Sequence, residues 1–279
     1  MSSSASRSFP DWLSSMSSPR AGYRSGRRIS EIPDVLATGE LRVAFQPLVT
    51  LRTMEIYAYE ALVRSTSPHF KHPGQLIDAA IAHDYIGPLG RIIRELAVAG
   101  CPDHPLFLNI HPTEFDHSWL VQPDDPMFRH DHPVYLEITE QVPLERFDHC
   151  HGVLREIRHK GARLAVDDLG AGYSNLKYIA DLQPEVVKLD RGLVSDLRIE
   201  TRLHRLVMHI VRMCEDLGAR VVAEGIETAE EARAVIEAGV HYGQGYFFAR
   251  PGFHPPGVSE EAMRVRRMSR LPFPMRGAD

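Results

Sequence analysis

The sequence has no apolar stretch of the roughly 18 to 20 residues that a membrane-spanning helix requires. Its first residues also lack the apolar segment of a secretory signal peptide. An excess of basic residues is missing as well, since the formal net charge is −5. We therefore expect a cytoplasmic protein with no membrane span and with no general affinity for the phosphates of DNA or RNA polymers.

Cysteine is scarce in this sequence. Its three cysteines, Cys101, Cys150 and Cys214, are odd in number and lack the paired spacing of a zinc site or a disulfide framework. We interpret them as reduced residues of the core.

The remaining composition is that of a globular protein. Hydrophobic residues make up 43% of the 279-residue chain and charged residues 25%, which is enough apolar surface for a large core. Residues 1–30 are rich in serine and arginine and poor in apolar side chains, so they predict a disordered tail. Residues 255–279 are also expected to be a tail, which leaves one domain at 31–254. The basic residues of the tails could contact an acidic partner, such as a regulatory protein, or a membrane surface. We favour the alternative, which is solvated charge.

Short apolar runs alternate with amphipathic stretches along this domain, as expected for strands and helices around a parallel sheet. The expected strands are Val43–Val49, Ile56–Val63, Leu106–Ile110, Val134–Ile138, Leu164–Val166, Val186–Leu189, Val221–Ala223 and Tyr246–Phe248. Eight such runs predict an α/β fold, a single-domain TIM-like (β/α)8 barrel. The link around Arg52 and Thr53 is too short for a parallel crossover, so one antiparallel strand is expected there.

Polar side chains recur at the carboxyl ends of these runs. They are Glu60, Asn109, Glu137, Asp167 with Asp168, Lys188, Glu224 and Gln244. In a barrel these ends converge on one face, so residues distant in sequence would surround one cavity. Any one of them alone is equally well explained as a strand-end cap or a salt bridge.

Carboxylates gathered in this way repel one another unless cations or protons compensate them. All-oxygen ligands favour Mg²⁺ or Mn²⁺, and adjacent Asp167 and Asp168 make two cations plausible. Paired cations suit phosphoester hydrolysis. The residues by themselves support a metal site more firmly than turnover, because a barrel can also bind a phosphate ligand without cleaving it.

The segment Glu60–Arg64, E-A-L-V-R, resembles the signature of the EAL-domain cyclic di-GMP phosphodiesterases. Other motifs follow in the family's order over about Ile32–Pro251: F-Q-P-L from Phe45, L-N-I-H-P ending at Pro112, L-E-I-T-E ending at Glu140, D-D-L-G-A-G-Y-S from Asp167, V-K-L-D ending at Asp190, A-E-G-I-E-T from Ala223 and Q-G-Y from Gln244. The resemblance implies metal-dependent hydrolysis of cyclic di-GMP to linear pGpG in bacterial signalling.

The resemblance also implies residue roles. The first of two cations, Mg²⁺ or Mn²⁺, would be held by Glu60, Asn109, Glu137 and Asp167. Asp167, Asp168 and Glu224 would serve the second. Lys188 would orient or activate the attacking water, and Glu224 is an alternative base. The nucleotide would lie against Gln46, Leu62, Arg64 and Gln244, with Arg64 paired to a phosphate.

The segment Asp168–Ser174 resembles the family loop that links the metal site to a dimer interface, held by a glutamate equivalent to Glu140. Gly170 and Gly172 permit unusual backbone angles there. A homodimer is therefore expected. His111, which shares a strand face with Asn109, is either a neighbour of the metal ligands or, as we favour, a structural histidine.

Two other classes of function stay open at this point. A non-catalytic cyclic di-GMP receptor would bind the nucleotide without converting it and act through a protein partner. A partner-binding regulator would use the barrel as a scaffold and neither bind nor convert the nucleotide. The complete set of acidic residues with Lys188 favours the enzyme.

Overall fold

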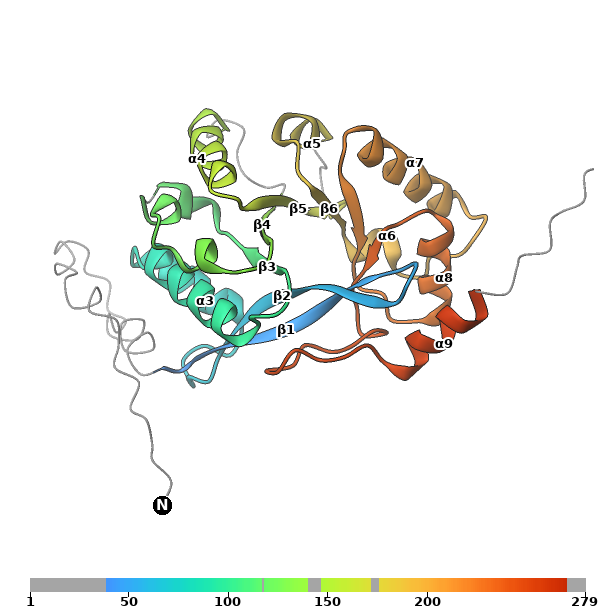
Figure 1. The fold of residues 1–279 in the computed structure, drawn as a ribbon, viewed down its shortest axis with the longest axis horizontal. Coiled ribbons are helices and arrows are strands. Elements are labelled where there is room, and N and C mark those ends of the chain that lie inside the picture. Colours follow the sequence, from blue (N-terminus) through green and yellow to red (C-terminus); the bar gives the residue numbers. More distant parts are fainter. Residues whose placement is uncertain (1–38, 117, 140–146, 172–175, 270–279) are drawn as a thin grey trace, which may run out of the picture.

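The structure, a computed structural model, describes residues 39–116, 118–139, 147–171 and 176–269. Eight strands form a closed barrel in sequence order (Figure 1). They are β1 (Leu41–Thr50), β2 (Glu55–Ser65), β3 (Leu106–Asn109), β4 (Val134–Thr139), β5 (Arg163–Leu169), β6 (Val186–Leu189), β7 (Arg220–Ala223) and β8 (Tyr242–Gly243). The predicted TIM-like barrel is confirmed.

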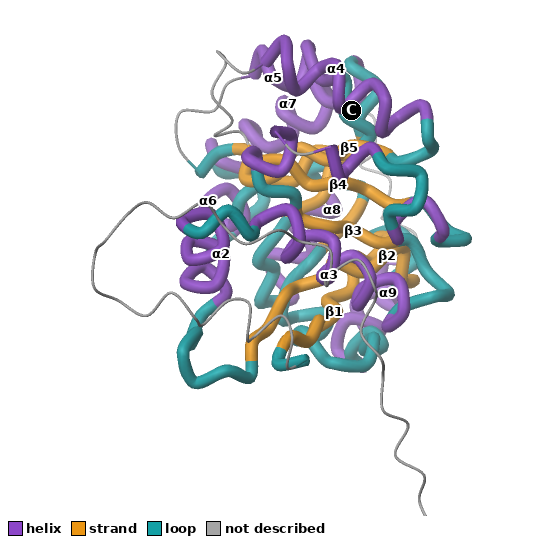
Figure 2. The backbone as a smooth tube through the Cα atoms, turned by 90° about the vertical axis from the view of Figure 1, so that its left-hand side faces the viewer, coloured by secondary structure: helices purple, strands orange, loops and turns teal. Residues whose placement is uncertain are grey.

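Helices surround the strands, which occupy the centre of the molecule in Figure 2. The α-helices are α2 (Pro73–Ala82), α3 (Ile86–Gly100), α4 (Phe147–His159), α5 (Leu176–Leu182), α6 (Arg191–Val194), α7 (Arg202–Asp216), α8 (Ala229–Glu237) and α9 (Glu260–Ser269). Three short 3-10 helices follow β3: η2 (Pro112–Asp116), η3 (Ser118–Val121) and η4 (Pro126–Arg129). None of the helices in the described ranges combines the length and apolar character that crossing a bilayer needs.

Strand β1 is the antiparallel member of the barrel. It pairs antiparallel with both β2 and β8, whereas every other neighbouring pair is parallel. A four-residue turn, 51–54, joins β1 to β2, and Met54 takes a left-handed backbone conformation there (φ 55°). This confirms the hairpin predicted from the short link, which is too short for a crossover helix.

The eighth strand was predicted in the wrong place. It is Tyr242–Gly243, and the apolar residues Tyr246–Phe248 form a turn beyond it. The backbone N–H of Phe247 donates to Ile226 O (3.0 Å) and that of Phe248 to Gly245 O (3.1 Å). Both phenylalanines are buried in this turn, so the apolar run reflects packing and not a strand. The short β8 places Gln244 directly after a strand, as its role at a strand end requires.

The C-terminal segment was also predicted incorrectly in part. Residues 255–279 were expected to be a tail, but α9 occupies Glu260–Ser269 and contacts α8. Ala262 and Val265 on this helix are buried in the same apolar cluster as Val235 of α8. The arginines between these apolar residues made the segment look like a polar tail. The apolar residues nevertheless form one short stripe of an amphipathic helix, which packs on the outer layer of the barrel. The expected N-terminal tail lies outside the described residues.

The cysteine prediction is confirmed where the structure describes the side chains. Cys101 and Cys214 are free and buried. The side chain of Cys150 lies outside the described residues.

The amino ends of the barrel strands are filled by aromatic residues. Tyr135 stacks on Phe107 with ring centroids 4.4 Å apart, and its hydroxyl accepts a hydrogen bond from Arg163 (2.7 Å).

A buried ionic triad stabilises the packing of α3 against the segment that follows β3. The guanidinium of Arg94, on α3, bonds to Asp125 with both Nε (3.1 Å) and an Nη (2.9 Å). Its other Nη donates to Glu114 (2.9 Å). All three side chains are at most 3% exposed, so each charge depends on its partners for compensation.

His241, which lies between β7 and β8, is expected to make the stability of the protein depend on pH. The backbone N–H of Val221 donates to Nδ1 of His241 (3.1 Å), and Nε2 lies 3.1 Å from a carboxylate oxygen of Glu215 on α7. Nδ1 therefore carries no proton, and Nε2–H donates to Glu215. Burial, with nearby Arg220, lowers the pKa of His241 below its ordinary value, although Glu215 opposes the shift.

We expect the free energy of unfolding to fall at acidic pH because His241 is neutral in the folded protein. Since the pKa is lower in the folded protein, the unfolded chain binds the proton first as the pH falls below about 6.5, and protonation at Nδ1 would break the bond from Val221. The urea midpoint of the wild type should fall between pH 7.5 and 5.5 by more than that of His241→Gln. His209→Gln, at an exposed position on α7, is the control. Equal pH dependence in wild type and His241→Gln would contradict the assignment.

Candidate active site

Lys188, on β6, lies among four carboxylates that come from four other strands of the barrel or directly follow them. Its Nζ is 2.6 Å from Glu137 and 2.6 Å from Glu224. Asp167 is 3.3 Å away and Glu60 3.5 Å. The lysine side chain is only 1% exposed. Strands β2, β4, β5, β6 and β7 thus bring residues that are far apart in sequence to one point, as predicted.

Glu60 connects this cluster to two amides. Its Oε1 accepts a hydrogen bond from Asn109 Nδ2 (3.0 Å), and its Oε2 accepts one from Gln244 Nε2 (2.6 Å). Gln244 Nε2 also lies 3.3 Å from Gln46 Oε1, and Gln46 donates to the carbonyl of Ala249. Residues from β1, β2, β3 and the turn after β8 therefore fix one edge of the site.

Burial and charge shift the pKa values of the cluster. Burial by itself lowers the pKa of Lys188, but its four carboxylate neighbours outweigh burial and hold that pKa well above its ordinary value. Burial and the charge of Glu60 raise the pKa of Glu137 well above its ordinary range, against the effect of Lys188. Burial also raises the pKa of Glu224 to about 7, with Asp167 and Glu60 adding to the shift and Lys188 opposing it.

The donor atoms of the site fit a hard divalent cation. Asp167, Asp168 and Glu224 each place a carboxylate oxygen so that all three lie within 4.8 Å of one another. Glu137 Oε2 is buried without a hydrogen-bond donor in the described part of the chain, and Asp167 Oδ1 has no hydrogen bond there besides its ion pair with Lys188. Buried carboxylate oxygens of this kind are compensated when they coordinate a cation.

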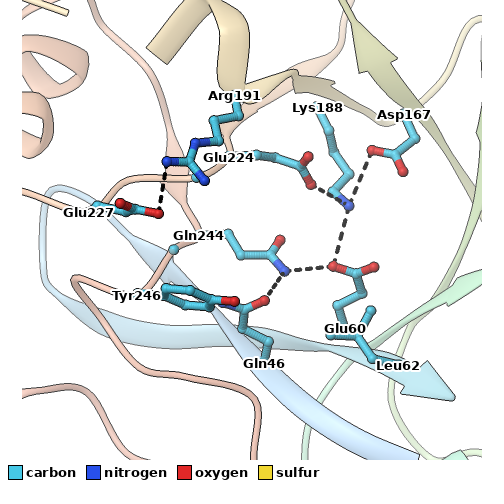
Figure 3. A pocket seen from close by; sticks show the side chains of 12 residues that line it. Gln46, Glu60, Leu62, Asp167, Lys188, Arg191, Glu224, Glu227, Gln244 and Tyr246 are labelled. Carbon is cyan, nitrogen blue, oxygen red and sulfur yellow. Dashed lines mark hydrogen bonds and ion pairs between the residues drawn. The ribbon is translucent and has the colours of Figure 1, made fainter. Parts of the chain in front are cut away.

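A cavity of about 250 Å³ opens over this cluster (Figure 3). The described residues that line it are Gln46, Glu60, Leu62, Asp167, Lys188, Arg191, Glu224, Gly225, Glu227, Gln244, Gly245 and Tyr246. Figure 3 shows Lys188 and Asp167 on one side of the cavity and Arg191 with Glu227 on the other. The cavity thus has an acidic floor and a rim that carries charges of both signs.

The structure brings most of the predicted site residues together, but Arg64 is not among those that line the cavity. Its Nη donates to the carbonyl of the preceding residue, Val63 (2.8 Å). His111 does not line the cavity either, and its Nδ1 lies 2.8 Å from Thr113 Oγ1. This contact fits the structural role that we favoured.

The predicted loop after Asp168 is described only in part. Gly170 has a φ of 104°, which confirms the unusual backbone angle expected there. A Cβ at this position would approach a side-chain carbon of Leu193 to 2.6 Å. Glu140 and Gly172 lie outside the described residues.

The sequence interpretation missed several residues of the cavity: Arg191, Gly225, Glu227, Gly245 and Tyr246. A signal for two of them was present, because Arg191 and Glu227 each follow a predicted strand-end residue, Lys188 or Glu224, by three positions. Tyr246 was overlooked because it was assigned to a strand.

The family follows from a direct comparison. The EAL domain profile matches residues 29–251, so this chain belongs to the EAL domain family. Cyclic di-GMP phosphodiesterase PA2567 of Pseudomonas aeruginosa is 30% identical over 246 residues, which cover 83% of this chain and 42% of that protein. Uncharacterized protein y4lL of Sinorhizobium fredii is 34% identical over 83% of this chain and 29% of its own length. The chain thus spans less than half of these two relatives.

Solved structures share the fold. The calcium and cy-diGMP complex of BlrP1 from Klebsiella pneumoniae has a TM-score of 0.70 at 31% identity, covering 78% of this chain and 58% of that chain. A standalone EAL protein of Vibrio cholerae in its c-di-GMP-bound form has a TM-score of 0.69 at 28% identity, covering 80% of this chain and 97% of that chain.

Proposed function

We propose that this EAL domain hydrolyses cyclic di-GMP to linear pGpG with two divalent cations, Mg²⁺ or Mn²⁺. The observation that carries the proposal is the buried Lys188 among four carboxylates at the mouth of the barrel. Relatives named as cyclic di-GMP phosphodiesterases, such as PA2567, support the substrate.

We assign the cation ligands as two overlapping sets. Glu60, Asn109, Glu137 and Asp167 would hold the first cation, and Asp167, Asp168 and Glu224 the second. The buried, incompletely hydrogen-bonded oxygens of Glu137 and Asp167 support the first set, and the close approach of the other three carboxylates supports the second. When bound, such cations polarise the phosphoryl oxygens and favour a hydroxide nucleophile at neutral pH.

The protein's own residues would orient the reaction. Lys188 Nζ, held in place by Glu137 and Glu224, would position the attacking water and offset the negative charge that develops on phosphorus. Glu224 is the alternative base, since its side chain is 20% exposed toward the cavity. The new bond joins the water oxygen to phosphorus and the P–O3′ bond breaks, and the proton that the water loses is balanced by the one that the leaving 3′ oxygen takes up.

The remaining cavity residues would bind the nucleotide. Gln46, Leu62 and Gln244 line the cavity beside Glu60 and offer amide and apolar contacts to the ligand. For Arg64 to bind a phosphate, its guanidinium would have to leave the carbonyl of Val63. Arg64→Gln tests that role by the change in KM.

Purified protein is expected to convert cyclic di-GMP to pGpG in Mg²⁺ or Mn²⁺ and to lose this activity in EDTA. Glu60→Gln should lower turnover by at least about a hundredfold, because it removes a ligand charge and disturbs the bonds to Asn109 and Gln244. Glu55→Gln, at the exposed start of the same strand, is the matched control. Chromatographic separation of substrate and product gives the rate.

The alternative is a non-catalytic receptor that signals cyclic di-GMP through a protein partner. Tight binding with intact substrate in every metal would favour it over the enzyme. If the protein neither bound nor converted cyclic di-GMP, a scaffold for partner proteins would be favoured instead. Titration calorimetry with cyclic di-GMP separates these two outcomes.

We further propose a cytoplasmic homodimer that contacts its copy through the loop after Asp168. Sedimentation at several protein concentrations tests the oligomeric state. Contact between the basic tails and a regulatory partner stays the less favoured of the alternatives that the sequence left open.

A further inference from the structure

Two ion pairs of similar form line the cavity, one at its floor and one at its rim. Lys188 on β6 and Glu224 directly after β7 form the floor pair at 2.6 Å. Arg191 and Glu227 each lie three residues further along the chain and form the rim pair at 3.0 Å. The floor lysine is 1% exposed, whereas Arg191 is 58% and Glu227 39% exposed. The rim pair is therefore the solvent-exposed one, and it lies across the cavity from Lys188 and Asp167 (Figure 3).

The backbone of Arg191 is held in place by a capped helix start. It is the first residue of α6, whose N-cap, Asp190, accepts a hydrogen bond from the backbone N–H of Gly192 (2.8 Å). The stem of Arg191 crosses Gly225, where an added Cβ would approach the Arg191 Cγ to 2.6 Å. Gly225 has a φ of 67° and so brings bare backbone beneath the arginine. The stem is thus positioned while the guanidinium stays accessible.

Glu227 is also mounted rigidly, through the start of α8. Its backbone N–H donates to Glu231 Oε2 (2.8 Å), which also accepts from the N–H of Thr228 (3.0 Å). Thr228 and Glu231 form a capping box. Because the cap fixes only the backbone of Glu227, its carboxylate can turn away from Arg191 without disturbing the helix.

Arg191 differs from the other charged residues of the cavity in sign and exposure. Four carboxylates line it: Glu60, Asp167, Glu224 and Glu227. Lys188 is covered by the floor carboxylates, which leaves Arg191 as the exposed basic residue among the described residues of the lining. A doubly anionic ligand entering this cavity would meet its guanidinium before the floor.

We propose that Arg191 is a substrate-binding residue that takes a phosphate of the cyclic dinucleotide at the rim, and that Glu227 pairs with Arg191 until the phosphate takes its place. An exposed ion pair contributes little free energy, whereas a guanidinium can bind a phosphate through two parallel hydrogen bonds. The entering phosphate therefore displaces Glu227. The inference rests on the proposed function and assigns a substrate contact to the rim of the same site.

Steady-state kinetics with cyclic di-GMP and Mg²⁺ test the proposal, because the two partners of the rim pair are expected to behave oppositely. Arg191→Gln should raise KM about tenfold or more, with kcat within about threefold of the wild type. Arg191→Lys should recover part of the affinity, and Glu227→Gln should leave KM unchanged or lower it. The KM of Arg191→Gln should also depend less on salt. Arg233→Gln, which removes an exposed ion pair outside the cavity, is the control.

Several results would overturn the inference. With an active wild type, an unchanged KM in Arg191→Gln would remove Arg191 from substrate binding and leave the proposed function intact. Equal increases in KM for Arg191→Gln and Glu227→Gln would show that the pair only supports the structure. If the wild type binds cyclic di-GMP without turnover, the Kd values of the same variants are compared in place of their KM values, and an unchanged Kd in Arg191→Gln would overturn the inference. A wild type that neither binds nor hydrolyses cyclic di-GMP would overturn the proposed function and this inference together.

Discussion

Replacing Lys188 by methionine is expected to lower kcat for cyclic di-GMP hydrolysis by about 10² to 10³-fold. Methionine keeps most of the length and apolar volume of the side chain, which is almost fully buried. It removes the positive charge that lies 2.6 Å from both Glu137 and Glu224. The water would then lose its orienting donor, and the transition state would lose a compensating charge.

Metal content must be measured beside the rate, since the lysine also separates carboxylates that we assign as cation ligands. We expect Lys188→Met to retain bound Mg²⁺ or Mn²⁺, because loss of a competing cation does not weaken the ligands. Glu224→Ala should lose both turnover and part of the metal. Lys71→Met, at an exposed position before α2, serves as the control. A kcat of Lys188→Met within tenfold of the wild type would exclude the proposed role of the lysine.

Replacing Arg94 by methionine is expected to destabilise the protein by about 3 to 5 kcal/mol, the largest effect on stability that the structure predicts outside the active site. The change leaves the buried carboxylates of Glu114 and Asp125 without their shared guanidinium partner. Burial already raises the pKa of Glu114, against the opposing effect of Arg94. Urea unfolding at pH 7.5 measures the loss.

Two control variants separate the triad from ordinary ion pairs. Arg233→Met removes an exposed pair with Glu230 at 3.9 Å and should change the free energy of unfolding by less than about 0.5 kcal/mol. Replacing Arg94, Glu114 and Asp125 together by apolar residues should cost less than Arg94→Met alone, because no charge is then left unpaired. If Arg94→Met cost as little as Arg233→Met, the buried triad would not stabilise the packing of α3.

Strand ends were the most predictable part of the active site. The sequence placed Glu137, Asp167 and Lys188 at the carboxyl ends of apolar runs, and both carboxylates lie within 3.3 Å of the lysine Nζ. Glu60 was also predicted at a strand end; it lies in the middle of β2 but reaches the same point, 3.5 Å from the lysine Nζ. This succeeded because parallel strands in a barrel bring one end of every strand to the same face. Only the order of apolar runs was needed for that inference.

Side-chain direction beyond the strands could not be predicted in the same way. Arg191, for example, reaches the cavity from the first residue of α6. Once a chain leaves a strand, local turns and caps decide where a side chain points, and periodicity carries no information about them. Tyr246–Phe248 was mistaken for a strand for the same reason, since burial in a turn and in a strand give the same apolar run.

The sequence by itself determined the class of fold and the chemistry at the strand ends, because hydrophobic periodicity and residue type act locally along the chain. Tertiary structure decided the register that closes β1 against β8, the burial of α9 against α8, and the rim pair of Arg191 and Glu227. Each depends on contacts between distant segments. Their free energies arise only when the barrel closes, so no local pattern in the chain specifies them.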